Sequence, residues 1–480
     1  MGRRALRIFL LAAGGCLMLA GAAAGFVYWQ AQTIVDEFQA GPKRQAVESA
    51  RPELEVDPRR PTQAPSATST RARTILLIGS DRRFGNPTRH SDTIVLLRLD
   101  PAAHRAALLS VPRDLYVAIP GRGRARVNDA YSLGGPALLI RTLREVLGVR
   151  VNHFFDVSFG GFERVVNALG GVYLPIDQRY FNHNVGTAAT NYANIDLLPG
   201  YQKLNGREAL AFVRFRHTDS DRYRASRQQL FLLATARQAL GTHAYDLGRV
   251  RRLLRAFAKA TTSDVDGLGE LWGLVGGART AAAGHVRRYT LPARDLQLYG
   301  ADYVTATHRQ IRSTVRAWLG EHRSQPASHA QKQKAKRKAP APVLLRRDPT
   351  TPRQLLSATG QWVPCRPTAL PRGFWWPERA AARSYRLAGH PAAALYATRG
   401  SGRSILWMWT TWRHPPILDA PTRTVARGRR TYELTSVAGR VHEVAWRMGE
   451  WRVWITNTLR DELSARTLLK LAESCRQARG

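Results

Sequence analysis

Three apolar runs between residues 74 and 112 constrain the fold of this chain more than any other feature. TILLIG (74–79), DTIVLLRLD (92–100) and AALLSVP (106–112) each read as a buried strand. Asp81 follows the first run, Asp92 begins the second, and Arg113 follows the third. Because a sheet fixes the geometry at its strand ends while the loops give access, we expect these charged side chains to form a site.

The segments after these runs predict the fold class. Residues 134–148 and 160–172 read as helices that end at glycines, and residues 151–159 read as a strand between them. Residues 204–216 predict a helix with Asn205 as its N-cap, residues 220–240 a strong helix, and residues 286–291 a strand. Strands that alternate with helices predict an α/β (α+β mixed) domain, with a central mixed sheet flanked by helices.

The candidate site residues are two carboxylates and a set of basic side chains. Arg214 and Arg216 alternate on one segment, and Arg224, Arg227 and Gln228 share one face of the 220–240 helix. Carboxylates hold a hard cation such as Mg²⁺, and guanidinium forks grip phosphate oxygens, so this set suits a metal-assisted pyrophosphate site. The structural alternative makes Asp81 and Asp92 turn residues and makes the arginines solvated or paired at the surface.

The N-terminus predicts a membrane anchor. Residues 8–29 contain no charge and follow Arg3, Arg4 and Arg7, a pattern typical of a single span across the cytoplasmic membrane with the N-terminus inside and the rest extracytoplasmic. A cleaved signal peptide and a lipoprotein site at Cys16 are the alternatives. This divides the N-terminal part into a cytoplasmic tail (1–7), a transmembrane helix (8–29), and a stalk and linker (30–73).

The remainder divides into a catalytic domain (74–321), a basic disordered linker (322–352) and a Trp-rich α+β domain (353–480). The last domain predicts a strand meander closed by a helix at 463–475. Of the three cysteines, Cys365 and Cys475 lie near its two ends and could form a disulfide. The chain has no C-x-x-C pair, so we expect no structural zinc site.

The formal net charge of +38 predicts an anionic partner, which could be nucleic acid, an acidic membrane surface or an anionic polymer. Charge alone does not choose among them. The chain has no helix-turn-helix or zinc-finger pattern, which argues against nucleic acid.

Several motifs over residues 74–240 resemble the LytR-CpsA-Psr family, in the family's order. These are GSDRR (79–83), SDTIVLLRLDP (91–101), SVPRDLYVAIPGRG (110–123), RVNDAYSLGG (126–135), GFERVVNALGGV (161–172), LNGREALAFVRFR (204–216) and DSDRYRASRQQ (219–229). Each motif alone is weak, whereas the ordered set is specific.

The resemblance implies an extracytoplasmic ligase that moves a glycopolymer, with its phosphate, from a polyprenyl-pyrophosphate carrier to peptidoglycan. It also implies an apolar lipid tunnel between the sheet and the helices. The matching positions assign Mg²⁺ (or Mn²⁺) to Asp81 and Asp92, pyrophosphate binding to Arg89, Arg113, Arg214, Arg216, Arg224, Arg227 and Gln228, and catalysis to Arg113, Arg214, Arg216 and Asp114. His90 stands where the family usually has Arg, and Arg89 is one residue early.

Two rival functions stay open at this point. The same site could use water as the acceptor, which would make the protein a pyrophosphatase or glycan hydrolase. The chain could instead be a non-enzymatic, membrane-anchored regulator that binds nucleic acid or an anionic polymer. The sequence does not name the glycopolymer, the general base, the role of the Trp-rich domain or the oligomeric state.

Overall fold

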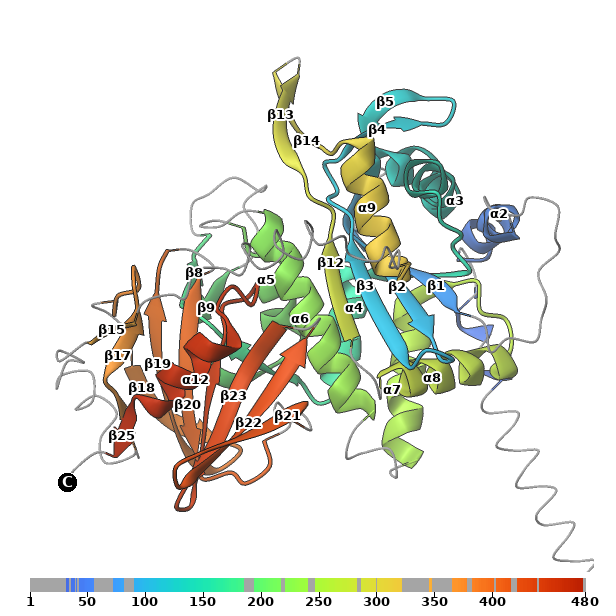
Figure 1. Ribbon diagram of the computed structural model, residues 1–480. Helices are drawn as coiled ribbons and strands as arrows, with labels where there is room; N and C mark the ends of the chain where they lie inside the picture. Colours follow the sequence, from blue (N-terminus) through green and yellow to red (C-terminus); the bar gives the residue numbers. More distant parts are fainter. Residues whose placement is uncertain are drawn as a thin grey trace, which may run out of the picture.

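The computed structural model describes residues 32–33, 36–38, 40, 43–55, 72–81, 90–184, 194–216, 221–240, 247–282, 286–298, 300–321, 345–347, 365–377, 382–400, 403–415, 421–437 and 440–477. The three apolar runs form β1 (Arg73–Asp81), β2 (His90–Asp100) and β3 (Arg105–Ser110), and three further strands are β6 (His153–Ser158), β11 (Thr261–Ser263) and β12 (Val286–Thr290). Within the described residues these make one six-stranded sheet, ordered β11-β6-β1-β2-β3-β12 (Figure 1). The β1–β6 and β3–β12 pairs are parallel and the others antiparallel, so the expected mixed sheet is confirmed.

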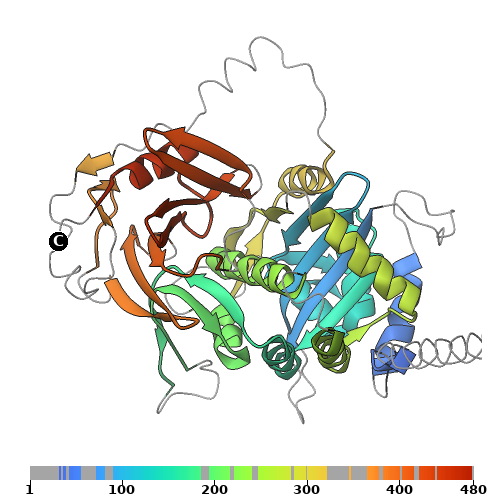
Figure 2. The same ribbon diagram turned by 90° about the horizontal axis from the view of Figure 1, so that it is seen from below.

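Helices cover both faces of this sheet (Figures 1 and 2). On one face lie α2 (Lys43–Glu55), α3 (Val127–Leu147) and α9 (His308–Leu319), and on the other lie α6 (Asp221–Leu240), α7 (Leu247–Ala260) and α8 (Leu268–Ala282). Successive β1 side chains lie on opposite faces of the sheet: Leu76 packs with Leu139 and Trp318, whereas Ile75 packs with Ala258 and Leu271. The sheet therefore separates two apolar cores.

Antiparallel strand pairs and two short helices complete the first domain. The strand pairs are β4 (Tyr116–Ile119) with β5 (Gly123–Arg126), β7 (Val172–Ile176) with β10 (Gly200–Leu204), β8 (Tyr180–Asn182) with β9 (Ile195–Leu197), and β13 (Arg294–Leu298) with β14 (Ala301–Thr305). The helices are α4 (Phe159–Ala168) and α5 (Gly206–Arg214). Asn205 caps α5 by accepting from the Glu208 amide at 3.0 Å, which confirms the predicted start.

The N-terminal boundary of this domain differs from the expected stalk and linker. Helix α2 continues to Glu55, and Val47, Ala50 and Leu54 are buried in the core that it shares with α3. Glu53 forms ion pairs with Arg141 and with Arg144 of α3. These apolar and ionic contacts make α2 part of the folded domain, and residues 56–71 of the expected linker lie outside the described residues.

The expected single-pass membrane topology stands corrected. Among the residues that the structure describes, no helix is both long enough and apolar enough to cross a bilayer. Residues 8–29, on which the expectation rested, lie outside the described residues.

The C-terminal part is a Trp-rich sheet. Its strands are β18 (Ala382–Leu387), β19 (His390–Thr398), β20 (Ser404–Thr410), β21 (Arg423–Arg427), β22 (Arg430–Val437), β23 (Arg440–Met448) and β24 (Trp451–Thr456), followed by α12 (Ala465–Glu473). Within the described residues they form a seven-stranded antiparallel sheet, ordered β18-β19-β20-β24-β23-β22-β21. Trp407, Trp409 and Trp446 are fully buried there, so these tryptophans are core residues and do not form a sugar-stacking surface.

Four short strands join the ends of this domain. They are β15 (Leu345–Arg347), which pairs with β17 (Ala369–Pro371), and β16 (Cys365–Pro367), which pairs with β25 (Cys475–Gln477). Cys365 and Cys475 form the expected disulfide, with Cα atoms 5.3 Å apart. Strand β15 lies inside the expected 322–352 linker, whose other residues lie outside the described part of the chain.

Candidate functional site

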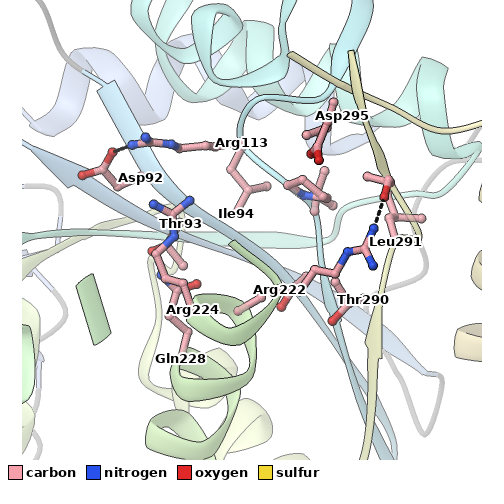
Figure 3. Close-up of a pocket in the computed structure, with 16 residues that line it drawn as sticks. Asp92, Thr93, Ile94, Arg113, Arg222, Arg224, Gln228, Thr290, Leu291 and Asp295 are labelled. Atoms are coloured by element: carbon pink, nitrogen blue, oxygen red, sulfur yellow. Dashed lines mark hydrogen bonds and ion pairs between the residues drawn. The ribbon is translucent and has the colours of Figure 1, made fainter. Parts of the chain in front are cut away.

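A β-bulge positions Asp92. The ladder pairs Gly79 with Thr93 and Ser80 with Ser91, so Asp92 is the extra residue on β2. An extra residue bends the strand and redirects the side chain at that point. The Asp92 carboxylate forms an ion pair with Arg113 (Figure 3). Its other oxygen lies 3.9 Å from the Arg214 guanidinium. The bulge thus places one carboxylate between two arginines that are distant in sequence.

Arg113 and Arg126 share a second carboxylate, that of Asp114. Arg113 Nε lies 3.4 Å from Asp114 Oδ2, and Arg126 Nε lies 3.6 Å from Asp114 Oδ1. The Asp114 carbonyl also accepts the Val304 amide at 2.9 Å, which ties this segment to β14. Because both oxygens of Asp114 face guanidinium groups, its geometry favours the orientation of arginines over the removal of a proton.

A cavity of about 300 Å³ lies beside these residues, between β2, the segment after β3, α6 and β12 (Figure 3). Its polar lining includes Asp92, Thr93, Arg113, Arg222, Arg224, Gln228, Thr290 and Asp295, and its apolar lining includes Ile94, Val111, Leu291 and Val304. Three arginines therefore line one cavity, a composition that suits an anionic group with an apolar attachment.

Helix α6 supplies two of the expected cavity residues. Arg224 and Gln228 lie one turn apart and both line the cavity. Gln228 Nε2 donates to Thr93 Oγ1 at 3.0 Å and so links α6 to β2. Arg222 was missed by the sequence analysis, although it belongs to the same DSDRYRASRQQ motif and precedes Arg224 by two residues. Its guanidinium donates to the Ala293 carbonyl at 2.6 Å.

The structure does not bring Arg227 to the cavity. Its side chain is fully buried, and Nε donates to the Phe212 carbonyl at 3.1 Å. A second nitrogen of the guanidinium donates to the Phe215 carbonyl, and the group lies 5.1 Å from the centroid of the Tyr180 ring. Arg227 was therefore wrongly expected at the pyrophosphate site. It donates instead to carbonyls at the C-terminal end of α5, which have no amide partner within the helix.

Three other expected residues, Asp81, Arg214 and Arg216, are not among the residues that line the cavity. Arg214 ends α5, and its guanidinium lies 4.2 Å from the Phe159 ring centroid, whereas Arg216 is exposed. Asp81 ends β1 opposite His90, whose Nδ1 lies 3.2 Å from Ser132 Oγ. Arg89 lies outside the described residues, so the choice between Arg89 and His90 stays a prediction.

The expectation of a metal rests on two carboxylates, Asp81 and Asp92, on the paired strands β1 and β2. Within the described part of the chain there is no group of three or more His, Cys, Asp or Glu side chains that could enclose a metal ion. Asp81 and Asp92 nevertheless offer hard oxygen ligands, and Mg²⁺ is commonly held by one or two carboxylates together with substrate phosphates. The donor set therefore fits a cation that arrives with an anionic substrate.

Comparison with known proteins places these elements in a family. The model of the LytR_cpsA_psr family matches residues 35–318, which begins before α2 and ends in α9. The regulatory protein MsrR of Staphylococcus aureus (strain COL) is 32% identical over 193 residues, which cover 40% of this chain and 56% of MsrR. The chain therefore spans little more than half the length of that relative.

A named transferase and a solved structure are also similar to this chain. The polyisoprenyl-teichoic acid–peptidoglycan teichoic acid transferase TagU of Oceanobacillus iheyensis is 33% identical over 226 residues, covering 41% of this chain and 67% of TagU. The structure of TagT bound to LI-WTA is 25% identical and covers 53% of this chain and 94% of that chain, with a TM-score of 0.43.

Proposed function

From the premise that this chain belongs to the LytR_cpsA_psr family, we propose that it is a phosphotransferase that attaches a glycopolymer, with its phosphate, to peptidoglycan. The donor would be a polyprenyl-pyrophosphate-linked glycan. One observation carries the proposal: Asp92 pairs with Arg113 at the cavity that Arg222 and Arg224 also line, and its other carboxylate oxygen lies 3.9 Å from Arg214. The name of TagU, a transferase from a polyisoprenyl carrier to peptidoglycan, supports the same reaction class.

The arginines would neutralise the pyrophosphate. A hydroxyl of peptidoglycan attacks the glycan-bearing phosphorus, the bridging P–O bond breaks, and polyprenyl phosphate leaves. Guanidinium forks aimed at non-bridging oxygens stabilise the charge that develops in this step and align the reacting groups. Asp92 and Asp114 hold Arg113 in place. Mg²⁺ (or Mn²⁺), held by Asp81 and Asp92, would add positive charge at the phosphate oxygens.

The lipid tail would lie between the sheet and the helices α6 and α8. Leu77 and Leu97 sit on central strands, yet both stay partly exposed, as do Val286 of β12 and Leu232 of α6. Side chains in the middle of a covered sheet are usually fully buried, so partial exposure indicates that the helices leave apolar surface open. This supports the expected apolar tunnel as the place for a polyprenyl chain.

The test is acceptor-dependent transfer by the purified protein. A synthetic polyprenyl-pyrophosphate saccharide is incubated with and without peptidoglycan fragments, in Mg²⁺ and in EDTA. We expect saccharide on the acceptor with the wild type and a loss of about 10²- to 10³-fold in Arg113→Ala. Arg122→Ala, on the exposed turn between β4 and β5, is the matched control and should retain activity.

Two results would contradict the proposal. Release of the saccharide phosphate at the same rate with and without acceptor would make the protein a hydrolase. Absence of any turnover with lipid-linked donors, together with tight binding of anionic polymer, would favour a binding role.

A further inference from the structure

The loop between β24 and α12, residues 457–462, is called here the inter-domain loop. Asn457, Thr458, Leu459 and Asp461 are buried, whereas Arg460 and Glu462 are exposed. Leu459, on this loop, belongs to a cluster of first-domain side chains that includes Phe215, Tyr223 and Phe231. The Asn457 side chain fixes the shape of the loop, since it donates to the Val441 carbonyl at 2.8 Å and accepts from the Leu463 amide at 3.1 Å. The C-terminal domain thus inserts a braced segment into the domain that holds the site.

The inter-domain loop contacts the β12 wall of the cavity through Asp461. Its Oδ2 lies 2.5 Å from the Arg288 guanidinium, and its Oδ1 lies 2.7 Å from His442 Nδ1. The side chains of Arg288 and Asp461 are only 9% and 5% exposed. Thr290, two residues after Arg288 on the same strand, lines the cavity.

A second contact reaches the α6 wall. Arg403 of the C-terminal domain donates from Nε to the Tyr223 hydroxyl at 3.0 Å, and the same nitrogen lies 3.7 Å from Glu462 of the inter-domain loop. Tyr223 is the residue between Arg222 and Arg224, which both line the cavity. The C-terminal domain therefore contacts both walls within two residues of side chains that face the cavity.

These contacts specify position more than they add stability. A buried ion pair gains little net free energy because both charges lose their hydration, but a misplaced partner is strongly penalised. Asp461 also has a φ of +51°, a conformation uncommon for non-glycine residues although Asp tolerates it, and its amide donates to the Thr458 carbonyl at 2.8 Å. The loop thus holds one defined geometry against the cavity walls.

We propose that the inter-domain loop positions the β12 and α6 walls of the cavity, so that the C-terminal domain is part of the catalytic unit. Asp461, Arg288, Arg403 and Tyr223 are positioning residues in this account, and Arg222 and Arg224 are the groups that they place. The inference rests on the proposed phosphotransferase function for its kinetic test, but not for its binding test.

The test compares two carboxyl-to-amide changes in the full chain. Asp461→Asn removes the negative charge that pairs with Arg288. The control, Glu433→Gln, weakens an ion pair with the largely buried Arg452 that joins two strands of the C-terminal sheet and does not involve the inter-domain loop. We expect Asp461→Asn to lower kcat for transfer about tenfold or more, with the donor KM changed less than about threefold, because a small misplacement of catalytic groups is costly. Glu433→Gln should keep kcat within about twofold at a comparable loss in Tm.

A milder variant covers the case in which Asp461→Asn does not fold. Tyr223→Phe keeps the ring and removes only the hydroxyl that accepts from Arg403, and it should lower kcat about threefold, the kinetic equivalent of one hydrogen bond. Wild-type kcat in a folded Asp461→Asn, or in Tyr223→Phe, would overturn the proposal.

Binding of inorganic pyrophosphate, measured by calorimetry, separates this proposal from the proposed function. If the wild type transfers nothing, weaker pyrophosphate binding in Asp461→Asn than in Glu433→Gln still supports positioning by the loop. Equal binding in the two variants would overturn it, whatever the wild type transfers.

Discussion

Arg224 and Arg227 show at the scale of single residues how the environment decides what a guanidinium does. They lie three residues apart on α6, yet Arg224 lines the cavity while Arg227 is buried among carbonyls and rings. The first can meet an anionic substrate, whereas the second holds the C-terminal end of α5. Since α5 also carries Arg214, Arg227 contributes to the site through the backbone that it supports.

Arg227→Met should therefore behave as a stability variant. The change leaves the Phe212 and Phe215 carbonyls without their buried donor, which should lower the free energy of unfolding by about 2–3 kcal/mol. Urea unfolding followed by fluorescence measures this value. Arg216→Met, at an exposed position, is the control and should change it by less than about 0.5 kcal/mol. Equal stability of the two variants would argue that Arg227 faces substrate instead.

The sequence could predict the residues at strand ends but could not sort those on the helix. Asp92 and Arg113 adjoin apolar runs, so strand pairing brings them to the same end of the sheet, whereas the bulge that positions the Asp92 side chain was not predicted. Helical spacing places Arg224, Arg227 and Gln228 on one broad face, and periodicity carries no information on which part of that face meets α5. Arg222 was overlooked because it lies off that face, although the Ala293 carbonyl holds it at the cavity.

At the scale of elements, α2 shows how ion pairs attach an N-terminal helix to the domain. Burial opposes ionisation of the Glu53 carboxyl, but Arg141 and Arg144 together hold its pKa below the ordinary value of 4.5. The sequence did not predict this contact because the partners are distant in the chain. The helix itself runs from Lys43 to Glu55, with Pro52 inside it, within the segment that was expected to be a stalk and linker.

The lowered pKa predicts how pH affects this attachment. A carboxyl with a depressed folded-state pKa contributes stability above its unfolded pKa, and that contribution is lost as the pH falls through the folded value. Glu53→Gln should therefore be less stable than the wild type at pH 7, by about 1–3 kcal/mol, and the difference should shrink below about pH 4.5. Thermal unfolding from pH 3 to 7 measures it.

Glu48→Gln is the control for this pH series. Glu48 lies on the same helix, but its pair with Arg44 is largely exposed, so the change should have little effect at any pH. A constant difference between Glu53→Gln and the wild type across the series would contradict the linkage.

At the scale of the whole molecule, contacts from two domains determine the geometry of one site. The first domain supplies the site residues, and the C-terminal domain contacts two cavity walls, the β12 wall through Asp461 of the inter-domain loop and the α6 wall through Arg403. Sequence patterns predicted the strands, the closing helix and the disulfide of the C-terminal domain, because these follow from local alternation and cysteine position. They did not predict its docking, which depends on Leu459 and Asp461 meeting distant partners.

The disulfide should dominate the stability of the C-terminal domain. It joins residues separated by 110 positions, and a loop of that length is constrained strongly in the unfolded chain. Cys475→Ser should cost about 2–5 kcal/mol, read from denaturant unfolding by tryptophan fluorescence. Cys16→Ser is the control, because it leaves the disulfide intact. Dithiothreitol, which reduces the disulfide, should lower the unfolding midpoint of Cys16→Ser to that of Cys475→Ser. It should not change the unfolding midpoint of Cys475→Ser. Unchanged stability in Cys475→Ser would show that the packed core alone sustains the domain.

The most direct measurement of the central claim is the fate of the two phosphates of the donor. A polyprenyl-pyrophosphate saccharide with ¹⁸O in the non-bridging oxygens of the phosphate next to the sugar is incubated with the protein and a peptidoglycan fragment, and both products are analysed by mass spectrometry. The account predicts an acceptor that has gained the saccharide with one labelled phosphate, together with unlabelled polyprenyl monophosphate. An acceptor that has gained the saccharide without phosphate, with polyprenyl pyrophosphate released, would contradict it.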